Sequence, residues 1–202
     1  MDYQEKEIKL FIKNLPTLAE RLRLCGGELI QPRVYEKNIR LDTSDAKLQQ
    51  ARKLLRLRQD DQVRVTFKEN AHLEDGVITR TEIEFGVTDL DAVQKLFEGL
   101  GYYPAIVYEK YRSTYRLGDV LVMLDELPIG NFVEIEAPNN ILIEGMVQML
   151  GLDGSKAIQT NYLGLWAMAK QNAGLKVHDL TFQALEGIEL SLEALGVQPA
   201  DM

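Results

Sequence analysis

Residues 5–10 read Glu-Lys-Glu-Ile-Lys-Leu, a stretch in which charged and apolar side chains alternate. Successive side chains of a β-strand point to opposite faces. The residues Glu5, Glu7 and Lys9 therefore share one face, and Ile8 and Leu10 share the other. This period of two predicts a strand with one charged face and one apolar face.

The same alternation recurs along the chain and predicts strands at 54–58, 63–68, 80–85, 108–115, 119–125 and 132–136, with 33–42 as a weaker eighth candidate. Helical periodicity predicts helices at 16–25, 89–100, 140–150, 155–171 and 179–195. Three times a Glu-x-Glu strand is followed by a helix and a glycine, and Val-Tyr-Glu-Lys occurs at both 34–37 and 107–110. This repetition favours a sheet closed on itself.

Composition excludes several classes of protein. The chain has 202 residues, 46% of them hydrophobic and 27% charged, which suits a globular domain and excludes wholesale disorder. A net charge of −8 argues against general nucleic-acid binding. No run of 18 apolar residues and no basic-then-apolar leader occurs, so we expect no membrane span and a cytoplasmic location. The single cysteine, Cys25, excludes an internal disulfide; it lies on an apolar helical stripe and is expected in the core.

The charged strand faces carry two opposite sets of side chains. The basic set is Lys9, Arg56, Arg58, Arg64, Lys68, Arg80, Lys110 and Arg112. The acidic set is Glu5, Glu7, Glu82, Glu84, Asp125, Glu134 and Glu136.

Two interpretations of these faces are open. They either face bulk water, as one side of an antiparallel sheet often does, or they line the inside of a closed sheet whose apolar face is covered by helices. A dry interior is excluded because each buried ion costs several kcal/mol. A wet interior would suit a polyanion together with divalent cations, since Arg matches phosphate oxygens and carboxylates match Mg²⁺ or Mn²⁺.

Six ordered motifs resemble those of one family. They are Glu5-x-Glu7-x-Lys9, Leu55-Arg56-Leu57-Arg58, Thr66-Phe67-Lys68, Arg80-Thr81-Glu82, Lys110-Tyr111-Arg112, and a closing segment with Asp125, Gly130 and Phe132 to Glu136. Together they resemble the CYTH superfamily of triphosphate tunnel metalloenzymes over about residues 3–170. That family includes class IV adenylyl cyclases, thiamine triphosphatases and inorganic triphosphatases.

The resemblance implies an α+β fold: a closed eight-stranded antiparallel β-barrel that forms a tunnel, with helices packed on the outside. The tunnel domain is expected at residues 1–171, followed by a helical appendage at 172–202 that either covers the barrel or mediates a homodimer.

The resemblance also implies roles for the charged residues. The expected ligands of Mg²⁺ or Mn²⁺ are Glu5, Glu7, Asp125, Glu134 and Glu136, with Glu82 and Glu84 as second-metal ligands or as braces for a neighbouring arginine. The expected substrate contacts are Lys9, Arg56, Arg58, Lys68, Arg80, Lys110 and Arg112.

Lys9 and Glu7 are the expected catalytic residues. Lys9 acts either as a proton acceptor with a lowered pKa or as a plain electrostatic contact. Some triphosphatases of the family place a tyrosine near this lysine, but the matching stretch here offers Ile39 or Arg40.

The sequence therefore predicts a metal-dependent phosphohydrolase that acts on an inorganic or organic triphosphate. The alternatives are an adenylyl cyclase that makes cyclic AMP and pyrophosphate from ATP, and a non-catalytic module that binds polyphosphate or a nucleotide. The expected partner is a small-molecule triphosphate, with neither nucleic acid nor membrane.

Overall fold

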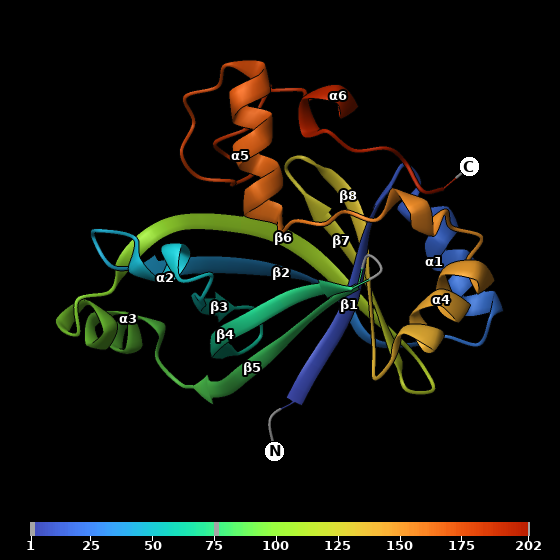
Figure 1. The fold of residues 1–202 in the computed structure, drawn as a ribbon, viewed down its shortest axis with the longest axis horizontal. Helices are drawn as coiled ribbons and strands as arrows, with labels where there is room; N and C mark the ends of the chain where they lie inside the picture. Colours follow the sequence, from blue (N-terminus) through green and yellow to red (C-terminus); the bar gives the residue numbers. More distant parts are fainter. Residues whose placement is uncertain (1–2, 75–76, 202) are drawn as a thin grey trace.

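The computed structural model describes residues 3–74 and 77–201, and of residues 3–5, 70–74 and 77–80 it describes the backbone alone. Eight antiparallel strands form the centre of the molecule (Figure 1). They are β1 (Tyr3–Ile12), β2 (Glu28–Asp42), β3 (Leu54–Gln59), β4 (Val63–Glu74), β5 (Val77–Val87), β6 (Tyr103–Leu117), β7 (Val120–Leu127) and β8 (Gly130–Ala137). All seven predicted strands and the weaker candidate at 33–42 are confirmed.

The first strand closes the sheet. β1 pairs with β5 on one side and with β8 on the other, so the strand order β1-β5-β4-β3-β2-β6-β7-β8 runs round a closed barrel. Closure gives every strand two neighbours, which leaves no exposed edge. It also gives the barrel an inner and an outer face along every strand.

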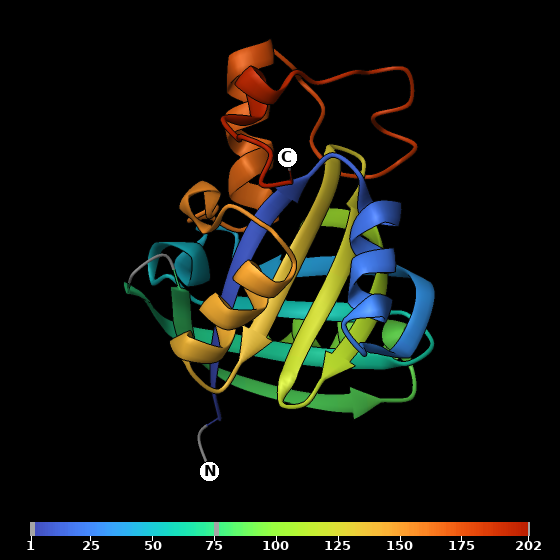
Figure 2. The same ribbon diagram turned by 90° about the vertical axis from the view of Figure 1, so that its right-hand side faces the viewer.

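Helices cover the apolar outer face. They are α1 (Leu15–Leu24), α2 (Lys47–Gln50), α3 (Leu90–Gly99), α4 (Asn140–Met149), η1 (Gly154–Lys156), α5 (Tyr162–Ala173) and α6 (Leu192–Leu195). Figure 2 shows α1 and α4 lying across β1, β7 and β8. There Leu10 and Ile135 pack against Leu22 of α1 and Ile143 of α4 in one buried cluster. Leu57 on the opposite wall packs in a second cluster, beneath α2 and α3.

Each main helix begins where a short polar side chain can cap it. The side chains of Asn14, Asp89, Asn139 and Asn161 accept hydrogen bonds from the backbone N–H of the third residue after each. Within the described part of the chain, no helix combines the length and the apolar character needed to cross a membrane.

Three local predictions were wrong. The helix expected at 155–171 begins only at Tyr162, because Ile158 leaves the helical path and donates its backbone N–H to the carbonyl of Lys9. Only Leu192–Leu195 of the helix expected at 179–195 is helical, since the backbone around Leu180 bonds to β6 instead. Cys25 is exposed, because α1 ends at Leu24 and Cys25 is its C-cap.

One end of the barrel is closed by aromatic side chains. Phe11 of β1 and Phe132 of β8 lie opposite each other, with ring centroids 5.3 Å apart. Tyr162 of α5 packs edge-on against Phe132 at 5.1 Å, and Leu185 and Leu195 of the tail join the same cluster. The tail thus covers this end of the barrel; the division into domains at residue 171 stays a prediction.

The β7–β8 hairpin supplies a test of this closure. Gly130 has φ +127°, and a Cβ at this position would lie 2.6 Å from the ring of Phe11. We expect Gly130→Ala to lower the free energy of unfolding by about 2–4 kcal/mol, from backbone strain plus overpacking. Gly145→Ala, inside α4, is the matched control. A Cβ at this position would meet no atom within 4 Å. Because alanine favours the helix over glycine, this variant should raise the free energy of unfolding by about 0.5–1 kcal/mol. Urea denaturation measures both; equal effects would contradict the packing described.

Candidate active site

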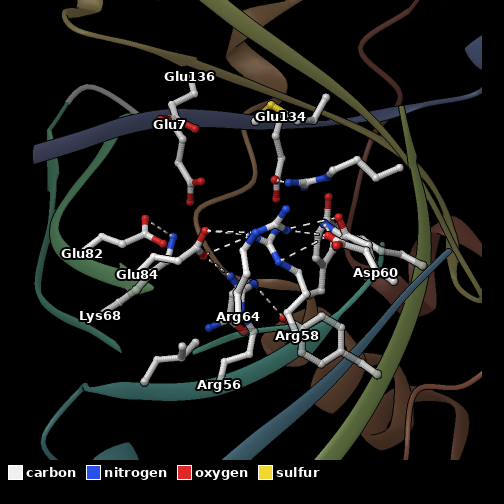
Figure 3. A pocket seen from close by; sticks show the side chains of 18 of the residues that line it. Glu7, Arg56, Arg58, Asp60, Arg64, Lys68, Glu82, Glu84, Glu134 and Glu136 are labelled. Carbon is white, nitrogen blue, oxygen red and sulfur yellow. Dashed lines mark hydrogen bonds and ion pairs between the residues drawn. The ribbon is translucent and has the colours of Figure 1, made fainter. Parts of the chain in front are cut away.

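The barrel encloses a cavity of about 640 Å³. Figure 3 shows charged side chains reaching into it from facing strands. The predicted site residues that line it are Glu7, Lys9, Arg56, Arg58, Lys68, Glu82, Glu84, Lys110, Arg112, Glu134 and Glu136, with Arg64 of the basic set. Asp125 is fully buried outside this lining, and the side chains of Glu5 and Arg80 lie outside the described residues. The charged rows therefore face an interior space.

Strands β3 and β4 provide an arginine-rich wall. Their pairing places Arg58 opposite Arg64 and Arg56 opposite Thr66, while the intervening Leu57 turns outward into the apolar cluster under α3. Burial and the neighbouring charge of Arg56 lower the pKa of Arg58. Positive charge is thus concentrated where a phosphate anion would neutralise it.

Two carboxylates of β5 hold this wall in place. The carboxylate of Glu84 accepts hydrogen bonds from Arg58 at 3.1 Å and from the Thr66 hydroxyl at 2.8 Å. The carboxylate of Glu82 lies 2.8 Å from the ammonium of Lys68. Glu84 thus contacts an arginine, as a brace would, whereas Glu82 contacts a lysine; whether either also holds a second metal stays a prediction.

A third carboxylate, Glu36 on β2, was missed by the sequence analysis. It is 1% exposed, and it lies 3.5 Å from Lys110 and 3.9 Å from Arg58. Burial alone would raise its pKa, but the charges of Lys110, Arg112 and Arg58 outweigh burial and lower the pKa to about 2. Glu36 therefore stays ionised and lies between the basic residues Lys110 of β6 and Arg58 of β3.

The repeated tetrapeptide was the signal that could have found Glu36. The copies at 34–37 and 107–110 pair with each other in antiparallel register, which sets Glu36 opposite Lys110 and Lys37 opposite Glu109. Glu36 and Lys110 face inward and their neighbours face outward. The same four residues thus supply an acid in one copy and a base in the other.

Lys9 lies beneath α5 and is paired with an acid. Its ammonium is 2.9 Å from Glu134 and 4.3 Å from the ring centroid of Tyr162. Glu134 also accepts a hydrogen bond from Arg112. Burial opposes ionisation of Glu134, but Lys9 and Arg112 hold its pKa well below the usual range. Glu134 therefore stays ionised at neutral pH.

Asp125 lies behind this cluster with both carboxylate oxygens engaged. Arg112 donates to one oxygen at 2.6 Å, while Lys110 at 3.0 Å and the Tyr162 hydroxyl at 2.7 Å donate to the other. Burial, together with the charges of Asp125 and Glu134, raises the pKa of Tyr162 well above its ordinary value. Tyr162 therefore remains a hydrogen-bond donor and ties α5 to the tunnel wall.

A second tyrosine was also missed. Tyr108 of β6 lines the cavity, and its hydroxyl accepts a hydrogen bond from Arg56 at 3.3 Å. Burial would raise its pKa, but the charges of Arg56 and Lys110 prevail and lower it. Of the two residues in the stretch matching the family's tyrosine, Arg40 lines the cavity and Ile39 packs on the outer face.

Glu7 and Glu136 form the part of the cavity best suited to a divalent cation. They face each other in register on β1 and β8, and both line the cavity. Like charges directly opposite each other on paired strands repel, and a divalent cation between them would relieve that repulsion. Among the described residues no three acidic, histidine or cysteine side chains converge as a complete metal site. Mg²⁺ suits such a partial set, because it commonly takes one or two carboxylates plus substrate phosphates.

The fold is thus a closed antiparallel barrel whose interior is lined by basic and acidic side chains. Residues 3–140 match the CYTH domain, and the chain belongs to this family. A Methanocaldococcus jannaschii protein provisionally named an adenylate cyclase is 27% identical over 172 residues, which cover 80% of this chain and 97% of the relative.

Solved structures share the fold. A Vibrio parahaemolyticus protein provisionally named an adenylate cyclase superposes with a TM-score of 0.71 at 20% identity, covering 83% of this chain and 99% of that chain. A Hippeastrum protein, also provisionally named an adenylyl cyclase and described as having a dominant triphosphatase activity, gives a TM-score of 0.60 at 18% identity, covering 81% of this chain and 95% of that chain.

The lowered pKa of Glu36 predicts how stability depends on pH. A carboxylate whose pKa falls from 4.5 to about 2 on folding stabilises the protein above pH 4.5, and this contribution is lost as the pH drops toward 2. At pH 7 we expect Glu36→Gln to reduce the free energy of unfolding by about 3 kcal/mol.

The deficit of this variant should shrink as the pH falls from 4.5 to 2. Denaturant titrations at each pH measure it, with the exposed Asp119→Asn as control. A deficit that is constant across this range would contradict the ion pairing assigned to Glu36.

Proposed function

We propose that this protein is a metal-dependent phosphohydrolase that cleaves a triphosphate bound inside the barrel. One observation carries the proposal: the cavity inside the barrel is lined by arginines and lysines together with carboxylates. An array of paired charges of this kind can exchange a partner for a phosphate oxygen or for a divalent cation. A triphosphate with a divalent metal supplies both.

The basic residues bind the phosphate chain. In this proposal Arg56, Arg58 and Lys68 contact phosphate oxygens from the β3–β4 wall, and Lys110 and Arg112 contact them from β6, together with Arg80. Their guanidinium groups are held by Glu84, Glu36 and Asp125 before any ligand enters. Preorganised donors of this kind favour the charge that develops during phosphoryl transfer, which depends mainly on positioning and electrostatics.

Glu7 and Glu136, together with Glu5, hold the metal in this proposal. The ion, Mg²⁺ or Mn²⁺, would neutralise phosphate oxygens and polarise a water molecule. Glu134 contacts Lys9 and Arg112 in the structure, so it reaches an ion only if a ligand takes over one of these partners. For Asp125 the geometry supports a bracing role in place of the metal role expected from sequence, because both its oxygens are engaged.

For Lys9 we propose a phosphate contact. Its ammonium is paired with Glu134 at 2.9 Å and lies over the Tyr162 ring, so its positive charge is stabilised where it faces the cavity. A charged ammonium fits an electrostatic role better than a proton-accepting one. Glu7 keeps its predicted catalytic role through the metal.

An adenylyl cyclase is the second candidate, favoured by the provisional name of the Methanocaldococcus relative. Cyclisation would use the same phosphate and metal contacts but would also need a site for the adenine base. A non-catalytic binding module is the third, with the same contacts and no turnover. A homodimer and a cytoplasmic location remain predictions.

Products distinguish the three functions. We expect incubation with inorganic triphosphate to release orthophosphate in the presence of Mg²⁺ or Mn²⁺, and to release none with excess EDTA. ATP supplied separately should give no cyclic AMP. Cyclic AMP formation would replace this proposal with the cyclase, and tight triphosphate binding without turnover would replace it with the binding module.

Loss of one wall arginine tests the tunnel assignment. The side chain of Arg58 is 13% exposed and lines the cavity, so Arg58→Ala should lower kcat/KM for the triphosphate by about 100-fold or more. Arg23→Ala, on the exposed surface of α1, is the matched control and should leave kcat/KM unchanged. Kinetics of Arg58→Ala equal to those of the control would place the phosphate elsewhere.

A further inference from the structure

A second cavity, of about 550 Å³, adjoins the tunnel where α5 crosses the ends of β2, β3 and β4. The two cavities share five lining residues, Arg40, Leu54, Lys68, Asn161 and Leu163, so they adjoin each other. The tunnel by itself already has the volume of a pocket for a drug-sized ligand. The additional space, called here the side chamber, therefore suits a ligand that extends beyond three phosphates.

The side chamber is basic although the whole chain has a net charge of −8. Its cationic lining residues are Arg40, Arg52, Lys53, Lys68 and Lys170, and its acidic ones are Asp42 and Glu69. Both acids are engaged. Asp42 accepts hydrogen bonds from the backbone N–H groups of Thr43, Leu48 and Gln49, and Glu69 pairs with Lys53 at 2.8 Å.

Arg52 lines the chamber from the turn that follows α2. Its φ is +55°, in the left-handed region that non-glycine residues rarely adopt. Lys170 reaches the chamber from α5 on the other side, with its ammonium 5.3 Å from the Trp166 ring centroid. The two cations thus approach the same space from separate elements.

The walls do not suit a nucleoside base. The only aromatic ring that contributes to the described lining, other than the exposed His178, is Trp166. Trp166 is 0% exposed and donates its indole N–H to the carbonyl of His178, so it offers no open face for stacking. Small apolar residues such as Ala105 and Ala167 complete the wall.

We propose that the side chamber binds the distal phosphates of a linear polyphosphate longer than triphosphate, while the reacting end of that chain lies in the tunnel. This inference rests on the proposed function and extends its substrate class. The cations of the side chamber continue the tunnel's basic wall, with Arg40 and Lys68 common to both cavities. Arg52 and Lys170 then contact only chains that leave the tunnel.

The test compares ligand lengths in the variant Arg52→Gln/Lys170→Gln. Affinities for inorganic triphosphate, for size-fractionated linear polyphosphate and for ATP are measured by calorimetry in EDTA at fixed ionic strength, so that turnover is absent and screening constant. Arg23→Gln/Lys95→Gln, at two exposed positions outside both cavities, is the control matched for the loss of two positive charges. Arg52→Gln alone is the second variant should the double variant fold poorly by circular dichroism.

We expect the double variant to lose about fivefold to tenfold affinity for linear polyphosphate and less than twofold affinity for triphosphate. The control variant should lose less than twofold affinity for either ligand. Equal losses for polyphosphate and triphosphate, or no loss for either, would overturn the inference. A loss confined to ATP would overturn it in favour of a nucleotide chamber. Polyphosphate binding that depends on Arg52 and Lys170, without orthophosphate release in Mg²⁺, would instead contradict the proposed hydrolysis and leave the side chamber in place.

Discussion

Charged side chains inside a closed barrel must be paired with one another, as Lys9 is with Glu134 at 2.9 Å. Charges removed from bulk water are tolerated only when they are paired and hydrogen-bonded, because an unpaired one costs several kcal/mol. Pairs of the same kind recur round the wall, as in Arg58 with Glu84 and Lys68 with Glu82. The barrel can therefore keep a polar interior without a bound ligand. A charged ligand that enters can then take the place of one member of an ion pair.

The same network couples the barrel to its C-terminal segment. Tyr162 is fixed by a hydrogen bond to Asp125, by its packing on Phe132 and by the ammonium of Lys9 above its ring. One helix thus closes the apolar end of the tunnel and orders the charged cluster beside it. Because α5 also forms a wall of the side chamber, its position influences both the tunnel and the route by which a longer chain leaves it.

Alternation grouped most residues of the site on the charged strand faces. A period of two along β1, β3 and β8 placed Lys9, Arg56 and Glu134 on charged faces, and the need of the helices for an apolar surface turned those faces inward. The pattern failed where an element is defined by distant contacts. The tail around Leu180 carries a helical pattern, yet its backbone bonds to β6. Glu36 lies on the strand with the weakest alternation, so its place was not predicted.

Side-chain direction in a strand depends only on local backbone geometry, so the strands, their two faces and the residue types available to an anion and a metal follow from the order of the amino acids. Which charges meet depends on the folded barrel. The two copies of Val-Tyr-Glu-Lys are identical as local sequence, yet Glu36 faces inward from one and Lys110 from the other. Register, barrel closure and the packing of α5 set these partners, and all three depend on contacts between residues that are far apart in the chain.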